Sequence, residues 1–205
     1  MNVENNIIQG ERVSLPTKYG HFEIIPFQEN ETKLEHIALV KGDFGPEDEV
    51  LTRIHSACAT GDLFGSLRCD CGEQLIKAME LIEQEGKGLL VYLQQEGRGI
   101  GLMNKIKAYK LQEEGYDTVD ANLHLGFRAD ERNYNIASQI LDALHIRKVR
   151  LMTNNPDKIL GMELAGIEVK KRIPLEIRQN KFNVDYLTTK QERMNHFLHH
   201  LKTAE

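Results

Sequence analysis

The beginning of the chain alternates short hydrophobic runs with turn residues. Three of these runs have the length and composition of β-strands: GHFEIIPF at 20–27, HIALVKG at 36–42 and EVLTRIH at 49–55. Turn residues, Gly42-Asp43 and Gly45-Pro46, separate the last two runs. The pattern predicts a β-rich N-terminal part that begins with antiparallel strands.

The hydrophobic pattern changes after residue 71. Leu75, Met79 and Ile82 follow one another at steps of four and three, which is the spacing of one helix face, and Gly86 is a helix stop signal. These positions predict a helix over 72–86. The next apolar run, GLLVYLQQ at 88–95, is typical of a buried strand.

The alternation of helix and strand continues along the rest of the chain. It predicts helices at 101–115, 133–146 and 156–166, strands at 148–155 and 167–175, and an amphipathic helix at 188–201. The fold class is therefore mixed α/β (α+β), with a β-rich N-terminal part followed by alternating helices and strands around a mixed sheet. Because no repeat, low-complexity tract or linker divides the chain, we expect one domain over 1–205, with 190–205 as a C-terminal helix or tail.

Composition favours a soluble globular protein. The chain has 205 residues, of which 40% are hydrophobic and 28% charged, and no segment approaches the roughly 20 apolar residues of a membrane-spanning helix. The N-terminus, MNVENNIIQGERVSLP, lacks the basic start, apolar run and cleavage site of a secretory signal. We therefore expect a cytoplasmic protein without a membrane partner, in a reducing compartment.

The charge balance disfavours a nucleic-acid partner. Lys and Arg total 26 against 31 Asp and Glu, which gives a net charge of -5, and the basic residues are not obviously concentrated in one place. There is no tryptophan and no stripe in which aromatic and basic residues alternate. A small anionic substrate held by a local group of basic residues is still compatible with this charge.

All three cysteines of the chain lie in one short segment, with the spacing Cys58-x10-Cys69-x-Cys71. Thiolates are soft ligands, so in a reducing compartment this cluster indicates a metal site, with Zn²⁺ as the natural candidate. Catalytic zinc sites use three protein ligands and leave a fourth position open, where the pKa of a bound water falls from about 15.7 towards about 7. Two other interpretations stay open at this point: His55 supplies a fourth ligand to a structural zinc, or the thiols are buried without a metal.

A glycine-rich turn, QQEGRGIGLMNK at 94–105, joins a predicted strand to a predicted helix. Backbone N–H groups at such a junction can receive a phosphate, and Arg98 would add a charged contact. A tight connection without a ligand explains the glycines equally well. Tyr109 lies four residues after Lys105 and so shares a helix face with it, which is usual for a packed tyrosine.

Two further segments combine polar residues with a helix start. LGFRADERNYN at 125–135 places Arg128, Asp130, Glu131 and Arg132 ahead of a helix, where capping and surface ion pairs are the favoured explanation. TNNPDK at 153–158 joins a strand to a helix and is suited to a second polar group of a ligand. Capping of that helix by an asparagine before Pro156 explains the segment equally well.

Four segments together closely resemble the GTP cyclohydrolase II family: GDLFGSLRCDCGEQL, QQEGRGIGLMNKIKAYKLQEEGYDTVDAN, LGFRADERNY and LMTNNPDKI. The resemblance runs from about Leu51 to Arg172. It implies a zinc-dependent, Mg²⁺-assisted enzyme of riboflavin biosynthesis that converts GTP into formate, pyrophosphate and 2,5-diamino-6-(5-phosphoribosylamino)pyrimidin-4-one. It also implies a homodimer. Because the chain lacks room for the dihydroxybutanone phosphate synthase domain fused in some relatives, we expect the monofunctional form.

The resemblance also implies a role for individual residues. The zinc ligands of the family fall on Cys58, Cys69 and Cys71, and its catalytic positions on Tyr109, Asp130 and Arg132. Its GTP-binding positions fall on Arg53, Ile54, His55, Ser56, Ala57, Gln74, Glu96, Gly97, Arg98, Thr118, Thr153 and Lys158.

Three of these roles are specific enough to state as expectations. Arg98 and Lys158 are expected near phosphates. In the family scheme Arg132 attacks the α-phosphate and Asp130 accepts its proton. Since a guanidinium has a pKa of about 13.8, stabilisation of transition-state charge by Arg132 is the alternative. Tyr109 is expected to supply a hydrogen bond or a proton while the purine ring opens.

The chain departs from the family pattern at one position beside the first cysteine. The usual HSEC is here His55-Ser56-Ala57-Cys58, so a carboxylate is absent, and we expect this to alter substrate preference or turnover before activity is lost. Two rival functions remain: a purine-nucleotide-binding regulatory protein of the same fold, and a structural zinc module that mediates macromolecular contacts.

Overall fold

The computed structural model describes residues 6–199, and its centre is one mixed sheet. The strands are β1 (Ile7–Gln9), β2 (Val13–Thr17), β3 (Gly20–Glu29), β4 (Glu35–Lys41), β5 (Glu49–Ser56), β6 (Gly88–Leu93), β7 (Lys148–Met152) and β8 (Glu168–Ile173). The helices are α1 (Ala59–Asp62), α2 (Cys71–Glu85), the 3₁₀ turn η1 (Glu96–Gly99), α3 (Gly101–Glu113), α4 (Thr118–His124), α5 (Asn135–Ala143), α6 (Pro156–Leu164) and α7 (Val184–Met194). The predicted fold class is confirmed.

The first four strands pair antiparallel, as the sequence predicts, while the order of the strands separates β4 from β5. The sheet runs β1-β3-β4-β6-β5-β7-β8, with β2 beside β3, so β6 lies between β4 and β5. β1 to β4 and β6 pair antiparallel, whereas β5 pairs parallel with β6 and β7. The runs at 36–42 and 49–55 are therefore not antiparallel neighbours. The physical reason is that β5 is buried along almost its whole length, as expected for a parallel strand covered on both faces.

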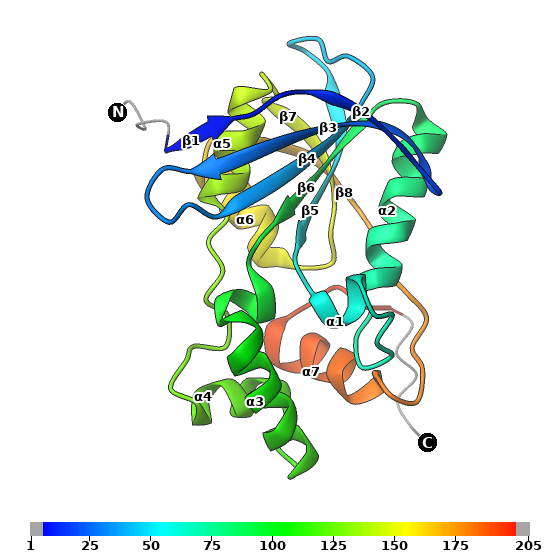
Figure 1. The fold of residues 1–205 in the computed structure, drawn as a ribbon. Coiled ribbons are helices and arrows are strands. Elements are labelled where there is room, and N and C mark those ends of the chain that lie inside the picture. Colours follow the sequence, from blue (N-terminus) through cyan, green and yellow to red (C-terminus); the bar gives the residue numbers. More distant parts are fainter. Residues whose placement is uncertain (1–5, 200–205) are drawn as a thin grey trace.

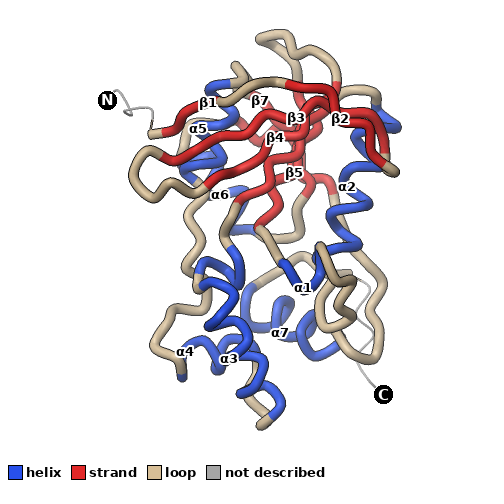
Figure 2. The backbone as a smooth tube through the Cα atoms, viewed as in Figure 1, coloured by secondary structure: helices blue, strands red, loops and turns tan. Residues whose placement is uncertain are grey.

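Helices cover the two faces of the sheet and leave one end open for a separate group of helices. Residues of α5 and α6 join one core cluster with β4, β5, β6 and β7, while α2 packs on the other face. Figure 1 shows α5 and α6 on one side, α2 on the other, and α1, α3, α4 and α7 beyond the end of the sheet. Figure 2 shows the strands gathered in one layer above those helices. β5 and β6 both point their carboxyl ends towards this group, because α1 and η1 follow them directly.

Local sequence signals explain most helix boundaries. The predicted helix at 72–86 is α2, which ends where Gly86 adopts a left-handed conformation with φ 75°. Asn155 caps α6 by accepting from the Asp157 amide at 2.9 Å, and Pro156 occupies its first turn. The last helix differs from the prediction at 188–201. It begins at Val184 and ends at Met194, because Asn195 adopts a left-handed conformation. Residues 200–205 of the predicted tail lie outside the described residues.

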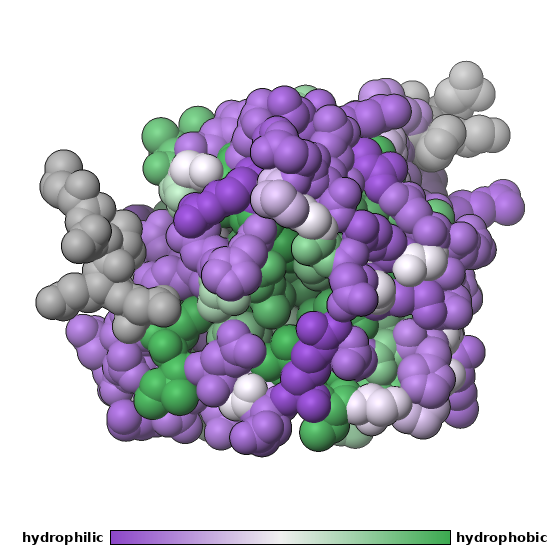
Figure 3. Space-filling view, turned by 90° about the horizontal axis from the view of Figure 1, so that it is seen from above, coloured by the Kyte–Doolittle hydropathy of each residue, from purple (hydrophilic) through white to green (hydrophobic). Residues whose placement is uncertain are grey.

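The surface over the sheet is mostly hydrophilic, with hydrophobic side chains showing between the polar ones (Figure 3). Across residues 6–199, none of the helices is long and apolar enough to traverse a lipid bilayer.

Candidate active site

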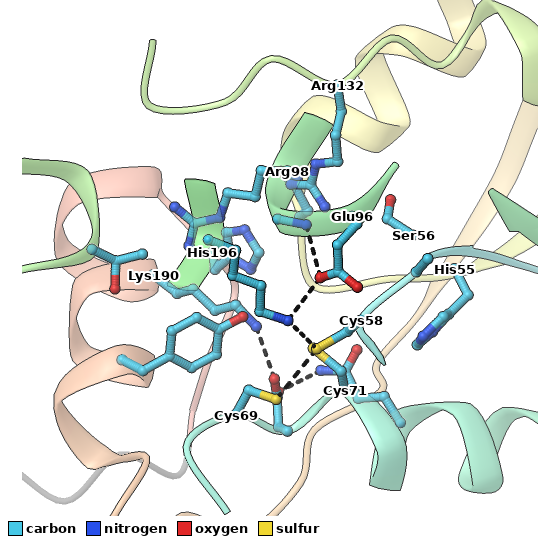
Figure 4. A pocket seen from close by; sticks show the side chains of 18 of the residues that line it. His55, Ser56, Cys58, Cys69, Cys71, Glu96, Arg98, Arg132, Lys190 and His196 are labelled. Atoms are coloured by element: carbon cyan, nitrogen blue, oxygen red, sulfur yellow. Dashed lines mark hydrogen bonds and ion pairs between the residues drawn. The ribbon is translucent and has the colours of Figure 1, made fainter. Parts of the chain in front are cut away.

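One pocket lies at the carboxyl ends of β5 and β6, between the sheet and the helices α3 and α7 (Figure 4). All the residues that the sequence predicts for the site line this pocket except two. They are Arg53, His55, Ser56, Ala57, Cys58, Cys69, Cys71, Gln74, Glu96, Gly97, Arg98, Tyr109, Thr118, Arg132, Thr153 and Lys158. Segments more than 100 residues apart in the sequence are thereby brought together at one place.

The two remaining predicted residues, Ile54 and Asp130, do not line the pocket but contact it through a neighbouring residue. Ile54 is fully buried in the core, and only its carbonyl reaches the site, where it accepts a hydrogen bond from Lys158 at 2.6 Å. Asp130 does not line the pocket but binds Arg132, which does. Both residues therefore act on the pocket through a neighbour.

The three thiols converge as the spacing predicts. The ligand atoms of Cys58, Cys69 and Cys71 all lie within 4.8 Å of one another, and the Sγ atoms of Cys58 and Cys69 are 3.6 Å apart. A Cβ at Gly61 would lie 2.9 Å from the Sγ of Cys69 and 3.3 Å from that of Cys58, so only glycine leaves room for the thiol group. Three converging soft ligands around a space kept free of side chains fit a zinc ion.

His55 is not part of this group. Its Nε2 lies 3.1 Å from both carboxylate oxygens of Asp62, and its ring stacks on Tyr92 at 5.4 Å between centroids. Asp62 also accepts a hydrogen bond from the Cys58 amide at 2.9 Å, so the pair fixes the backbone that carries the first thiol. Within the described residues, three cysteines converge here and no His, Asp or Glu joins them as a fourth ligand. The geometry therefore fits an open site better than a closed structural one.

Lys105 contacts the thiol group and was not singled out as a site residue from the sequence. Its Nζ donates to the Cys58 Sγ at 3.1 Å, to the Thr60 hydroxyl at 2.9 Å and to Glu96 at 2.7 Å. Burial alone would lower the pKa of Lys105, but the bond to Glu96 and the charge of Cys58 raise it. Hydrogen bonds from the other two thiols, helped by Lys105, lower the pKa of Cys58. The ammonium group thus stabilises a thiolate. In the sequence, the signal that could have identified Lys105 as a site residue is its position one helical turn before Tyr109.

The glycine-rich turn carries a strained backbone at the pocket wall. Gly97 and Arg98 both have left-handed conformations, with φ 62° and 61°, which is uncommon for arginine. A Cβ at Gly99 would lie 3.1 Å from the backbone of Glu131, whose amide donates to the Arg98 carbonyl at 3.0 Å. The turn is therefore held against the segment that carries Arg132, and this aims Arg98 into the pocket (Figure 4).

Two ion pairs in the segment 128–132 have different surroundings. Arg128 and Glu131 form a surface pair, as the sequence favoured, with the Arg128 side chain 78% exposed. Arg132 instead binds Asp130 through its Nε at 2.9 Å and its backbone amide at 3.0 Å, and both side chains are largely buried. Burial opposes the charge of Arg132, yet the neighbouring Tyr134 and Asp130 raise its pKa. Arg132 is therefore a firmly held cation.

Two further cations of the pocket, Arg53 and Lys158, are buried and pair with no carboxylate among residues 6–199. Arg53 donates to the Met152 carbonyl at 2.9 Å and to the Gln74 amide oxygen at 2.6 Å, and burial lowers its pKa to about 10. Burial, followed by the charges of Arg53 and Arg132, lowers the pKa of Lys158 well below its usual value. A site with such groups favours an anionic ligand, because an anion would stabilise their charged forms.

Tyr109 projects from α3 towards the thiols. Its hydroxyl lies 3.4 Å from that of Thr60, and the Arg68 guanidinium lies 4.3 Å from the centre of its ring. Burial raises the pKa of Tyr109, so the phenol keeps its proton. The group can therefore donate a hydrogen bond into the pocket.

Two threonines from different segments of the chain also line the pocket. The Thr153 hydroxyl accepts from the Asn155 amide at 3.0 Å, while Thr118 begins α4 after the cap residue Asp117. Both threonines line the pocket, as the sequence predicts.

Comparison with known proteins agrees with this arrangement. The family model of GTP cyclohydrolase II matches residues 9–174. The chain belongs to the GTP cyclohydrolase II family. The resemblance found in the sequence is thereby confirmed.

Curated relatives include proteins of two lengths. The riboflavin biosynthesis protein RibBA of Parabacteroides distasonis is 57% identical over 202 residues, which cover 98% of this chain and 50% of that protein. GTP cyclohydrolase-2 of Haemophilus influenzae is 52% identical over 190 residues, which cover 92% of this chain and 88% of that protein. The chain thus spans about half the length of the RibBA relatives. Among solved structures, RibBX of A. baumannii, a two-domain 3,4-dihydroxy-2-butanone 4-phosphate synthase, aligns with a TM-score of 0.47 at 19% identity, covering 86% of this chain and 42% of that one.

Part of the pocket lies beyond the segment matched by the GTP cyclohydrolase II model. Tyr186, Lys190, His196 and Leu198 line the pocket although the match ends at residue 174. The Lys190 ammonium pairs with Asp70, between two of the cysteines, at 2.9 Å. The sequence predicts a final helix in this region. It does not predict the contact with the thiol loop, because that contact joins positions 120 residues apart.

Proposed function

We propose that the chain is a zinc-dependent GTP cyclohydrolase II. It opens the imidazole ring of GTP and releases formate and pyrophosphate, which gives 2,5-diamino-6-(5-phosphoribosylamino)pyrimidin-4(3H)-one in the first step of riboflavin biosynthesis. The observation that carries the proposal is the three-thiol group at one side of a cation-rich pocket. The family membership supports it independently.

Cys58, Cys69 and Cys71 would hold the zinc. When bound, zinc supplies a Lewis acid and activates water for attack on the purine. Three thiolates give such a site a net negative charge, which opposes this activation. Lys105 offsets part of that charge through its hydrogen bond to the Cys58 sulfur. Tyr109 lies on the same helix face and donates a hydrogen bond to the purine half of the substrate.

The cations on the other side of the pocket would bind the triphosphate. Arg98, Arg132 and Lys158 line this side, and neither Arg98 nor Lys158 has a carboxylate partner within residues 6–199. Phosphate oxygens supply the missing negative charge, and Mg²⁺ would accompany them. We therefore expect the purine to lie near the thiols and the phosphates near Arg98.

Arg132 acts in this scheme as a stabiliser of charge on the α-phosphate. Its bonds to Asp130 keep the guanidinium protonated and fix its orientation, which suits electrostatic stabilisation better than nucleophilic attack. Trapping of a covalent nucleotide adduct separates the two roles. We expect any adduct that forms on the native protein to form on Arg132→Ala as well. An adduct on Arg132 itself, lost in Arg132→Ala, would establish the nucleophile instead.

The direct test is incubation of the purified protein with GTP, Mg²⁺ and Zn²⁺. Formate and pyrophosphate should appear in equal amounts, and ATP in place of GTP should give neither. GTP binding without formate would support the rival purine-nucleotide-binding regulatory protein. A firmly bound zinc with no nucleotide binding would support the structural zinc module.

Two finer properties follow from the family resemblance. We expect a homodimer, and apolar side chains exposed in the thiol loop and on α3, such as Phe64 and Met103, are suited to a protein contact. We also expect action in the cytoplasm, where unpaired thiols stay reduced. Sedimentation measurements on the purified protein test the first expectation, and fractionation of the source cells tests the second.

A further inference from the structure

The chain turns back into the pocket after α7. Asn195 has a left-handed backbone with φ 53°, the His196 amide donates to the Lys190 carbonyl at 3.0 Å, and the Phe197 amide donates to the Asn154 carbonyl at 2.8 Å. The last of these bonds ties the segment to the end of β7. His196 therefore projects into the pocket rather than into solvent (Figure 4).

The imidazole of His196 is half-buried, and one of its ring nitrogens is buried and unsatisfied. Its Nε2 finds no hydrogen-bond partner in the described part of the chain. One guanidinium nitrogen of Arg98 is also buried and unpaired. Figure 4 shows His196 beside Arg98. Buried polar atoms without partners are uncommon in proteins. Within the described residues, six residues that line the pocket carry one: Arg53, His55, Ser56, Arg98, Asn155 and His196. Such a group in one pocket indicates that a ligand satisfies these atoms, and His196 and Arg98 lie together within it.

Four basic side chains lie near this ring. Burial, followed by the charges of Lys190, Arg132, Arg98 and Lys158, lowers the pKa of His196 to about 2. The imidazole is therefore neutral and offers one N–H to a ligand. An anion seated among these cations would accept from that N–H.

Lys190 fixes the position of the segment that carries His196. Its Nζ donates to the Asp70 carboxylate at 2.9 Å, and Asp70 also accepts from the Gln74 side chain. Gln74 in turn accepts from Arg53 at 2.6 Å. This chain of bonds connects α7 with the thiol loop and with β5. Lys190 is therefore placed to act on the pocket through Asp70.

We propose that the segment 184–199 completes the phosphate side of the pocket, with His196 as a direct ligand of the triphosphate and Lys190 as a positioning residue. The proposal rests on the proposed function for the identity of the ligand, a purine nucleoside triphosphate. It adds phosphate contacts from a part of the chain that the family model does not match.

Binding measurements with three probes test the role of His196. GTP carries both halves of the ligand, guanosine only the purine half, and inorganic tripolyphosphate only the anion. We expect His196→Phe to weaken the binding of GTP and tripolyphosphate by about tenfold, the typical effect of losing a hydrogen bond to a charged group. Guanosine binding should not change. His196→Gln keeps an N–H at a similar position and should bind all three probes within about threefold of the native protein.

His199 provides the matched control, since it lies on the same segment with a 63% exposed side chain and bonds to Glu176 outside the pocket. His199→Gln should leave all three affinities unchanged. Equal losses of guanosine and GTP binding in His196→Phe would overturn the proposal, as would an unchanged tripolyphosphate affinity. Native protein that binds tripolyphosphate but not GTP would refute the proposed function, while the loss of tripolyphosphate binding in His196→Phe would still support the anion site.

Hydrogen exchange tests the positioning role of Lys190. Lys190→Met removes the bond to Asp70, so the Phe197 amide, which is bonded to Asn154, should exchange at least tenfold faster. KM for GTP should rise more than kcat falls. Lys190→Arg should restore both values in part. Unchanged exchange in Lys190→Met would show that Lys190 does not hold the segment.

Discussion

The central sheet and the pocket at its end are both deeply buried, yet their chemistry is opposite. Ile54, Val91 and Leu93 on β5 and β6 are fully buried apolar side chains whose removal from water stabilises the fold. Arg53 on β5 and Lys158 on α6 are almost as buried but carry ionisable groups without a carboxylate partner in residues 6–199. Burial therefore stabilises the sheet and opposes the charge of the pocket, which indicates that the pocket is arranged for a ligand.

The largest effect is expected when a thiol is removed from the pocket. Cys71→Ser should lose its zinc and lower formate release by more than the roughly 100-fold typical of changes around a metal site. Metal analysis and thiol titration check this, because all three cysteines of the chain belong to the group. The native zinc protein should show no reactive thiol before chelation and three afterwards. A zinc content in Cys71→Ser equal to that of the native protein would refute the ligand assignment.

A smaller effect is expected when the space between the thiols is filled. Gly61→Ala places a Cβ 2.9 Å from the Sγ of Cys69, so zinc affinity should fall by roughly 10–100-fold in a competition assay with a chelator. Gly65→Ala is the matched control in the same loop. Its Cβ meets no atom within 4 Å, although its φ of +62° makes the substitution strained. Gly65→Ala should therefore lower stability without changing zinc affinity, and an equal loss of affinity in both variants would contradict the account.

A pair of variants contrasts the two regions directly. Ile140→Ala in the core of α5 should lower the free energy of unfolding by about 2–5 kcal/mol and leave GTP affinity unchanged. Lys158→Met should weaken GTP binding by tenfold or more and raise the free energy of unfolding by about 1 kcal/mol at pH 7. Denaturant titrations and binding measurements on both variants check these opposite outcomes. If Lys158→Met lost as much stability as Ile140→Ala, the claim that burial opposes the charge of the pocket while it stabilises the core would be wrong.

The difference in the free energy of unfolding between the native protein and Lys158→Met should also depend on pH, in a direction that the pKa of Lys158 determines. Burial lowers the pKa of Lys158 in the folded chain, so above that pKa and below the unfolded value of about 10.4 the unfolded chain binds more protons. The free energy of unfolding of the native protein should therefore rise, relative to that of Lys158→Met, as the pH increases from 7 towards 10. An unchanged difference or a fall over this range would show that burial does not lower the pKa of Lys158 in the folded chain.

The smallest effect is expected at Ala57, where the family usually has glutamate. Ala57 lines the pocket and its backbone amide donates to the Leu93 carbonyl at 2.8 Å, so the position keeps its backbone geometry whatever its side chain. Ala57→Glu should change kcat/KM for GTP by less than about tenfold, roughly 1.4 kcal/mol. A loss of zinc or a change of more than a hundredfold would show that the absent carboxylate matters structurally.

The features that could be predicted from the sequence are those that depend on residues close together in the chain. The spacing of Leu75, Met79 and Ile82 predicts α2, and the spacing of the cysteines predicts the thiol group, because each depends on neighbouring residues. The sequence missed the position of β6 between β4 and β5, since strand order depends on contacts between distant segments. It missed the bond from Lys105 to Cys58, and the approach of Lys190 and His196, for the same reason.

The most direct test of the account is a zinc titration of the metal-free protein with GTP and Mg²⁺ present. Formate release should be absent without zinc, rise in proportion to added zinc and level off at one zinc per chain, with pyrophosphate released in equal amount. Formate release without zinc, or none at one equivalent, would contradict the account.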